Sequence, residues 1–144
     1  MNPHTEAVPR GTETLLLVED EPQVRAVVEA MLKPLGYTVL AAGSASEAIT
    51  IAESSPHAPD LLLTDVVMPG GSGRELSDTL MQRFPSLRVL FMSGYTDDAV
   101  LRHGIMHAEV DFVQKPFSRA TLARRIRDLL DRARHRGRHE SASR

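Results

Sequence analysis

Residues 60–73 read DLLLTDVVMPGGSG, an apolar run that ends at an aspartate and leads into a glycine-rich loop. The run from Leu61 to Thr64 does not alternate between polar and apolar residues, which is typical of a strand buried on both faces of a parallel sheet. Asp65 follows directly. The stretch predicts a central parallel strand with an acidic side chain at its carboxyl end.

Four further runs have the same apolar character: TLLLVE at 14–19, YTVLAA at 37–42, LRVLFMS at 87–93 and VDFVQ at 110–114. The five runs begin 23, 23, 27 and 23 residues apart, which leaves room for one helix between successive strands. This alternation predicts five βα units with right-handed crossovers, a doubly wound α/β sandwich forming a single domain.

Helical signals occupy the intervening segments. Apolar residues recur at helical spacing after Pro22, and two capping boxes, Ser44 with Glu47 and Ser72 with Glu75, precede further helical patterns. A fourth helix is expected at about 96–105, where few apolar residues are available, and a fifth opens at Ser118. Residues 14–133 are therefore expected to form the domain.

Composition narrows the class of protein. Of 144 residues, 42% are hydrophobic and 25% charged, which is ordinary for a globular domain. The absence of cysteine excludes disulfides and thiol chemistry. No apolar run reaches the ~18–20 residues of a membrane span, and the first residues carry no secretion signal, so a cytoplasmic protein is expected.

Charge is distributed unevenly along the chain. Residues 1–123 carry 9 Lys and Arg against 16 Asp and Glu, whereas residues 124–144 carry 8 Arg against 3 acidic residues. We expect residues 1–13 and the Arg-rich tail, 134–144, to be disordered. Nucleic-acid binding by this tail is left open as an accessory role and not favoured, since 118–144 contains no aromatic residue for base stacking.

Polar side chains follow four of the strands, where function gathers in open α/β sheets. They are Glu19-Asp20-Glu21, Asp65, Ser93 and Lys115-Pro116. Neighbouring carboxylates repel by up to ~4 kcal/mol per pair at 4 Å and an effective dielectric of 20, so such a cluster calls for a hard divalent cation such as Mg²⁺. A carboxylate in that setting, with an ammonium nearby, can attack phosphorus and form an acyl phosphate.

At these positions the sequence resembles the response-regulator receiver domain, over about residues 14–131. The motifs are LLVEDE at 16–21, LLLTDVVMPGGSG at 61–73, FMSGY at 91–95 and FVQKPF at 112–117. The resemblance implies a flavodoxin-like fold whose five-stranded parallel sheet has the order 2-1-3-4-5.

The resemblance also implies residue roles. Asp65 would accept the phosphoryl group. Asp20 would bind Mg²⁺ directly and Glu19 through water, with Asp65 and the Val67 carbonyl as the other protein ligands. Glu19 replaces the commoner aspartate, one methylene shorter, which a water-mediated contact should tolerate.

Other implied roles concern the activated state. Ser93 would bond a phosphoryl oxygen and Lys115 would form a salt bridge to the phosphoryl group, with the Lys115–Pro116 peptide bond in cis. Phe112 occupies the aromatic switch position, and the face made by helix four, strand five and helix five would signal. Val67 and Tyr95, at the positions that assist the hydrolytic water, predict slow loss of the phosphoryl group.

The sequence looks most like the receiver at the C-terminal end of hybrid sensor histidine kinases, although a stand-alone receiver remains equally open. The expected partner is a histidine kinase or a histidine phosphotransfer protein. No DNA-binding output domain is expected after residue 144, and no enzymatic activity beyond self-catalysed phosphorylation and slow dephosphorylation.

Three other interpretations compete. A flavin-binding flavodoxin-like protein shares the fold, but Glu19-Asp20-Glu21 would repel the flavin phosphate. A dehalogenase-type phosphatase needs a second aspartate two residues after Asp65, where Val67 stands. His103 and His107 have metal-ligand spacing, but no further ligands accompany them, so they are interpreted as surface residues.

Overall fold

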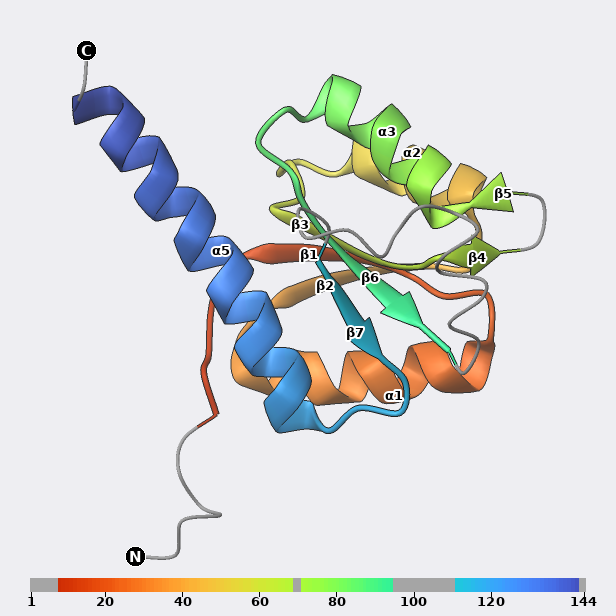
Figure 1. Cartoon of the computed structure of the whole chain (residues 1–144). Coiled ribbons are helices and arrows are strands. Elements are labelled where there is room, and N and C mark those ends of the chain that lie inside the picture. Colours follow the sequence, from red (N-terminus) through yellow and green to blue (C-terminus); the bar gives the residue numbers. More distant parts are fainter. Residues whose placement is uncertain (1–7, 69–70, 95–110, 143–144) are drawn as a thin grey trace, which may run out of the picture.

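A computed structural model describes residues 8–68, 71–94 and 111–142, and its five-stranded parallel sheet forms the centre of the molecule (Figure 1). The strands, in chain order, are β1 (Thr14–Val18), β2 (Thr38–Ala42), β3 (Leu61–Asp65), β6 (Arg88–Ser93) and β7 (Phe112–Gln114). Their order in the sheet is β2-β1-β3-β6-β7, and every pairing between them is parallel. This is the predicted order 2-1-3-4-5, so the expectation of a flavodoxin-like fold is confirmed.

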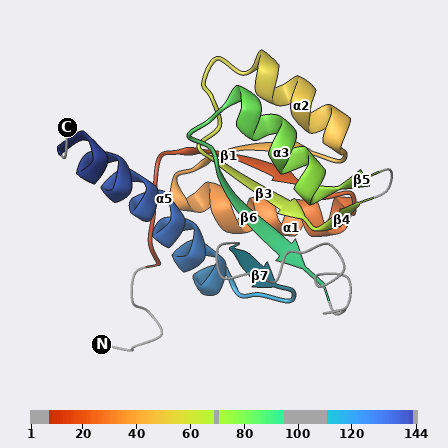
Figure 2. The ribbon, with the colours of Figure 1, turned by 45° about the horizontal axis from the view of Figure 1, so that its top comes forward.

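Among the described residues, four helices cover the two faces of the sheet (Figure 2). They are α1 (Pro22–Leu32), α2 (Ala45–Ser54), α3 (Gly73–Arg83) and α5 (Arg119–Ala142). Leu15 and Leu17 belong to a core cluster with α1 and α5, whereas Leu16 and Val18 belong to one with α2 and α3. Both sides of β1 are therefore buried, which explains its unbroken apolar run.

The helix starts follow the local sequence signals. Pro22 is the first residue of α1. The hydroxyl oxygens of Ser44 and Ser72 accept hydrogen bonds from the backbone amides three residues ahead, at the starts of α2 and α3. Each cap satisfies an amide that the helix leaves unpaired, worth ~1 kcal/mol. These starts fix where each strand-to-helix loop presents its side chains.

The structure differs from the sequence-based expectation in three places. A short hairpin, β4 (Val67–Met68) with β5 (Gly71–Ser72), follows β3. Strands of two residues have no periodicity by which a sequence would reveal them. Helix α5 runs to Ala142, into the tail expected to be disordered from 134. The apolar pattern ends near Leu130, but no proline interrupts the following residues, so the helical backbone continues.

The third difference is at the chain's beginning, where residues 8–13 were expected to be disordered. They pack against the domain instead: Val8 contacts the core cluster beneath α1 and α5, and the Gly11 amide donates to the Leu35 carbonyl oxygen. Leu35 ends a short 3-10 helix, η2 (Lys33–Leu35). The helix predicted at 96–105, together with Tyr95, His103 and His107, lies outside the described residues.

Candidate functional site

Three carboxylates meet at the carboxyl edge of the sheet. Glu19 and Asp20 follow β1, and Asp65 ends the neighbouring strand β3. One carboxylate oxygen from each lies within 4.8 Å of the others. The side chains of Glu19 and Asp65 are only 2% and 10% exposed, whereas Asp20 is exposed. The predicted acidic cluster is therefore present, with two of its three members withdrawn from water.

Lys115 bridges the two buried carboxylates. Its ammonium nitrogen lies 2.6 Å from Glu19 Oε1 and 2.7 Å from Asp65 Oδ1. The side chain reaches the cluster from the end of β7, where the Lys115 amide donates to the Ser93 carbonyl oxygen at 2.7 Å and the bond to Pro116 is cis. One positive charge thus faces two negative charges, and the buried part of the site keeps an excess of negative charge.

The electrostatics separate the two acids. Burial, reinforced by the neighbouring Glu19 carboxylate, raises the pKa of Asp65 to about 7 despite the ammonium of Lys115. Burial also acts on Glu19, but hydrogen bonds from Asp65, Lys115 and the Glu21 amide outweigh it and lower the pKa of Glu19. Burial opposes the charge of Lys115, yet its bonds to both carboxylates raise the Lys115 pKa. Asp65 is therefore the acid that holds its proton most readily in the metal-free site.

Backbone contacts that sequence reasoning missed hold the acids in place. The Glu21 amide donates to Glu19 Oε2 at 3.1 Å, and the Arg25 guanidinium donates to the Glu19 carbonyl oxygen at 2.7 Å. Arg25 is an ordinary polar residue in an amphipathic helix, so its sequence position gave no signal.

Gly73 packs directly beneath Asp65. A Cβ at this position would run into the Asp65 carbonyl oxygen, and the Gly73 amide donates to the Val66 carbonyl oxygen at 2.8 Å. The position therefore requires a residue without a side chain. The glycine directly after the capping Ser72 was the available signal, but a glycine there is equally consistent with an ordinary loop.

The remaining predicted site residues lie at different distances from the cluster. Ser93 is buried at the end of β6, next to Lys115 in the backbone. Phe112 is partly buried on the neighbouring strand β7, where it pairs with Phe91 and packs on the small cluster that Phe91 forms with Val66. Val67, just after Asp65, is 50% exposed. The structure thus brings Ser93 to the edge of the site and places Phe112 behind it.

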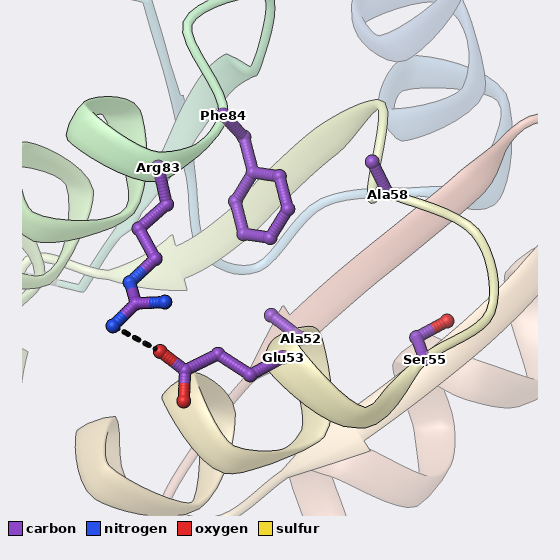
Figure 3. Close-up of a pocket in the computed structure, with 6 residues that line it drawn as sticks. All are labelled: Ala52, Glu53, Ser55, Ala58, Arg83 and Phe84. Atoms are coloured by element: carbon purple, nitrogen blue, oxygen red, sulfur yellow. Dashed lines mark ion pairs between the residues drawn. The ribbon is translucent and has the colours of Figure 1, made fainter.

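A separate hollow lies at the opposite end of the domain, where α2 and α3 finish (Figure 3). It measures about 280 Å³, and its lining residues are Ala52, Glu53, Ser55, Ala58, Arg83 and Phe84. An ion pair of 2.8 Å between Arg83 and Glu53 closes one side. The hollow shares no residue with the acidic cluster.

Comparison with known proteins identifies the family. The model of the response regulator receiver domain matches residues 15–127. The chain belongs to this family. The receiver is 38% identical over 122 residues to the sensor kinase CckA of Brucella abortus, covering 85% of this chain and 13% of that protein. It is 35% identical over 121 residues to the probable transcriptional regulatory protein TcrX of Mycobacterium tuberculosis, covering 83% of this chain and 50% of that protein.

A solved structure agrees with these relatives. The crystal structure of the receiver domain from hybrid histidine kinase CckA superposes with a TM-score of 0.67 at 34% identity, covering 81% of this chain and 98% of that one. The resemblance read from the four motifs is confirmed: this is a receiver domain of two-component signalling. The flavin-binding alternative gains no support. Within the described ranges, no helix has the length and apolar character needed to cross a bilayer.

Proposed function

We propose that this receiver accepts a phosphoryl group on Asp65 from the phosphohistidine of a kinase or phosphotransfer protein. An Asp65 carboxylate oxygen attacks phosphorus and forms a new P–O bond. The P–N bond to histidine breaks, and its electron pair returns to the imidazole. The observation that carries the proposal is the Lys115 ammonium, 2.7 Å from Asp65 Oδ1, where it would pair with the charge of an arriving phosphoryl group.

The site fits Mg²⁺. Its donors are carboxylate oxygens within 4.8 Å of one another, which suit a hard divalent cation, and the buried pair already accepts a cationic group in Lys115. Asp20 and Asp65 would hold the ion directly, Glu19 through water, and the Val67 carbonyl oxygen would complete the protein's ligands. Bound there, the ion would supply charge stabilisation to phosphoryl oxygens.

Ser93 and Phe112 would carry the signal away from Asp65. Ser93 is buried and its carbonyl oxygen accepts a hydrogen bond from the Lys115 amide, so its hydroxyl would turn toward Asp65 to bond a phosphoryl oxygen. That movement would vacate space into which Phe112 turns, altering the face made by β7 and α5. A two-state element biased by one added charge is the physical basis of such switching.

The protein context belongs to the proposal as well. The chain spans 13% of the CckA kinase and half of TcrX, so whether it works within a hybrid kinase or alone is decided outside the domain. We propose a cytoplasmic phosphoprotein that signals without catalysing turnover of another substrate. We assign no role in nucleic-acid binding.

Phosphorylation by a small-molecule donor tests the assignment. Incubation with acetyl phosphate and Mg²⁺ should add one phosphoryl group to the wild-type chain, mapped to Asp65 by mass spectrometry after borohydride trapping. Asp65→Asn should remain unmodified, and Asp78→Asn, which removes an exposed carboxylate of α3, should be modified like the wild type. Modification of Asp65→Asn to the wild-type extent would overturn the assignment.

A further inference from the structure

Residues 8–13, hereafter the N-terminal strap, lie alongside the domain before β1 begins (Figure 1). The strap is tied to η2, because the Gly11 amide donates to the Leu35 carbonyl oxygen at 3.1 Å and Arg10 donates to the Pro34 carbonyl oxygen at 3.0 Å. It is also tied to the start of β2, whose first amide donates to the Glu13 carbonyl oxygen. The strap is therefore an integral part of the fold.

The opposite side of the strap is held by one residue of α5. The Arg127 guanidinium binds both carboxylate oxygens of Glu13, at 2.6 and 3.1 Å, and donates to the Arg10 carbonyl oxygen at 3.0 Å. It also contacts the Tyr37 hydroxyl at 3.4 Å and Asp131 at 3.0 Å. A single side chain thus joins the strap, Tyr37 just before β2 and the following turn of α5.

These contacts are stronger than those of an ordinary surface ion pair. The Glu13 and Arg127 side chains are 13% and 18% exposed, so water screens them little. The hydrogen bond from Arg127 lowers the pKa of Glu13, which keeps the carboxylate charged. A two-bond guanidinium–carboxylate pair also fixes orientation, unlike a single point contact. If either Glu13 or Arg127 moves away, the other is left as an unpaired and largely buried charge.

Two glycines allow the close approach. A Cβ at Gly11 would run into the Tyr37 ring and the Arg127 guanidinium. Gly36 has a φ of 105°, and a Cβ there would meet the Gly11 carbonyl oxygen. The strap is therefore packed closely against Tyr37, Arg127 and Gly36. We expect its residues to detach from the domain together.

We propose that the N-terminal strap and α5 form one cooperative unit, so that the chain entering the domain and its last helix loosen together. Arg127 of α5 donates two hydrogen bonds to the Glu13 carboxylate and one to the Arg10 carbonyl oxygen, and this guanidinium bridges elements far apart in the sequence. A displacement of the entering chain then destabilises α5, and a displacement of α5 destabilises the strap. This coupling does not depend on phosphorylation of Asp65.

Reciprocal substitutions test the coupling in the 144-residue chain by residue-resolved hydrogen exchange. Arg127→Met, made in α5, should accelerate exchange of the Gly11 amide at least tenfold. Gly11→Ala, made in the strap, should accelerate exchange of the Leu129 and Leu130 amides by a similar factor, since coupling between two sites is mutual. Glu13→Gln, a milder change, should act in the same direction in both places.

The matched control is Arg83→Met, which removes an arginine from an ion pair on the α2–α3 side of the molecule (Figure 3). It should leave both sets of amides at their wild-type rates. The Leu62 amide in β3 measures global opening, and the strap and α5 amides must accelerate more than it does. If each substitution affects only its own element, or if all amides accelerate equally, the proposed unit does not exist.

Discussion

At the scale of single residues, Lys115 supplies the cation that faces both buried carboxylates. Its ammonium pairs with Glu19 and Asp65 at once, which reduces the repulsion between these two buried carboxylates. A divalent ion entering the same cluster would compete with this ammonium for the same oxygens. The Lys115 ammonium would then be free to pair with the negative charge of an arriving phosphoryl group.

The raised pKa of Asp65 makes the stability of the metal-free protein depend on pH. Burial raises this pKa from 3.8 to about 7, so the folded protein keeps a proton that the unfolded chain releases between about pH 4 and 7. Stability should therefore fall as pH rises through this interval and level off above it. Asp65→Asn should show a flatter profile and exceed the wild type at pH 8 by about 1–3 kcal/mol in chemical denaturation with EDTA present.

Added Mg²⁺ provides the second half of this experiment. An ion that binds the folded state alone stabilises it by mass action, so the wild type should gain stability at pH 8. The gain should shrink in Asp65→Asn and persist in Asp78→Asn. Equal gains in the wild type and Asp65→Asn would show that Asp65 is not part of the ion's site.

Val67 is expected to prolong the life of the phosphoryl group. Its side chain, two residues after Asp65, is 50% exposed, and it offers no hydrogen-bonding group to orient an attacking water. Val67→Asn should accelerate decay of the phosphorylated chain about tenfold, since positioning of a reactant commonly contributes ~1.4 kcal/mol or more. The decay is followed by mass spectrometry after removal of the donor.

Tyr95→Glu, at the other expected position, should also decay faster. Met81→Asn provides the control, because Met81 is an exposed apolar residue of α3 remote from the site. Wild-type decay in both Val67→Asn and Tyr95→Glu would mean that these side chains do not set the lifetime.

At the scale of elements, β6 and β7 join the site to Phe112, the proposed switch residue. The backbone contact between Lys115 and Ser93 and the pairing of Phe112 with Phe91 place the two strands in one register. Ser93→Ala should therefore accept a phosphoryl group at Asp65 but fail to shift the NMR resonances of Phe112. Ser86→Ala, in the exposed turn before β6, should shift them as the wild type does. If phosphorylation of Ser93→Ala shifts the Phe112 resonances as far as in the wild type, the coupling is refuted.

The elements differ in how far sequence predicts them. The strands and the starts of α1, α2 and α3 were predictable because unbroken apolar runs, Pro22 and the two capping serines act through local chemistry. The β4–β5 hairpin and the strap were not. The hairpin consists of two-residue strands too short to show a period, and the strap is held by contacts between distant segments, such as Glu13 with Arg127.

At the scale of the whole molecule, topology made the candidate site predictable. Parallel strands end at one edge, so polar residues after β1, β3, β6 and β7 had to lie together once the order of the strands was known. The bridging geometry of Lys115 and the support from Arg25 and Gly73 were not readable in this way. They depend on side-chain directions and close approaches that only the folded chain specifies.

The strap also fixes where preceding chain would be attached. It enters at the amino edge of the sheet, and the five residues of β1 separate it from Glu19, about 16 Å at 3.3 Å per residue. A phosphodonor domain fused ahead of this domain would be attached at the edge of the sheet opposite Asp65. A flexible tether spans about 5–6 Å × √n, so reaching roughly 25 Å around the domain takes about 20 residues. The donor's effective concentration at Asp65 would be greatest near this length. It would approach zero below about 8 residues, too few to cover the distance even when fully extended at about 3.3 Å per residue, leaving phosphotransfer to donors on other chains.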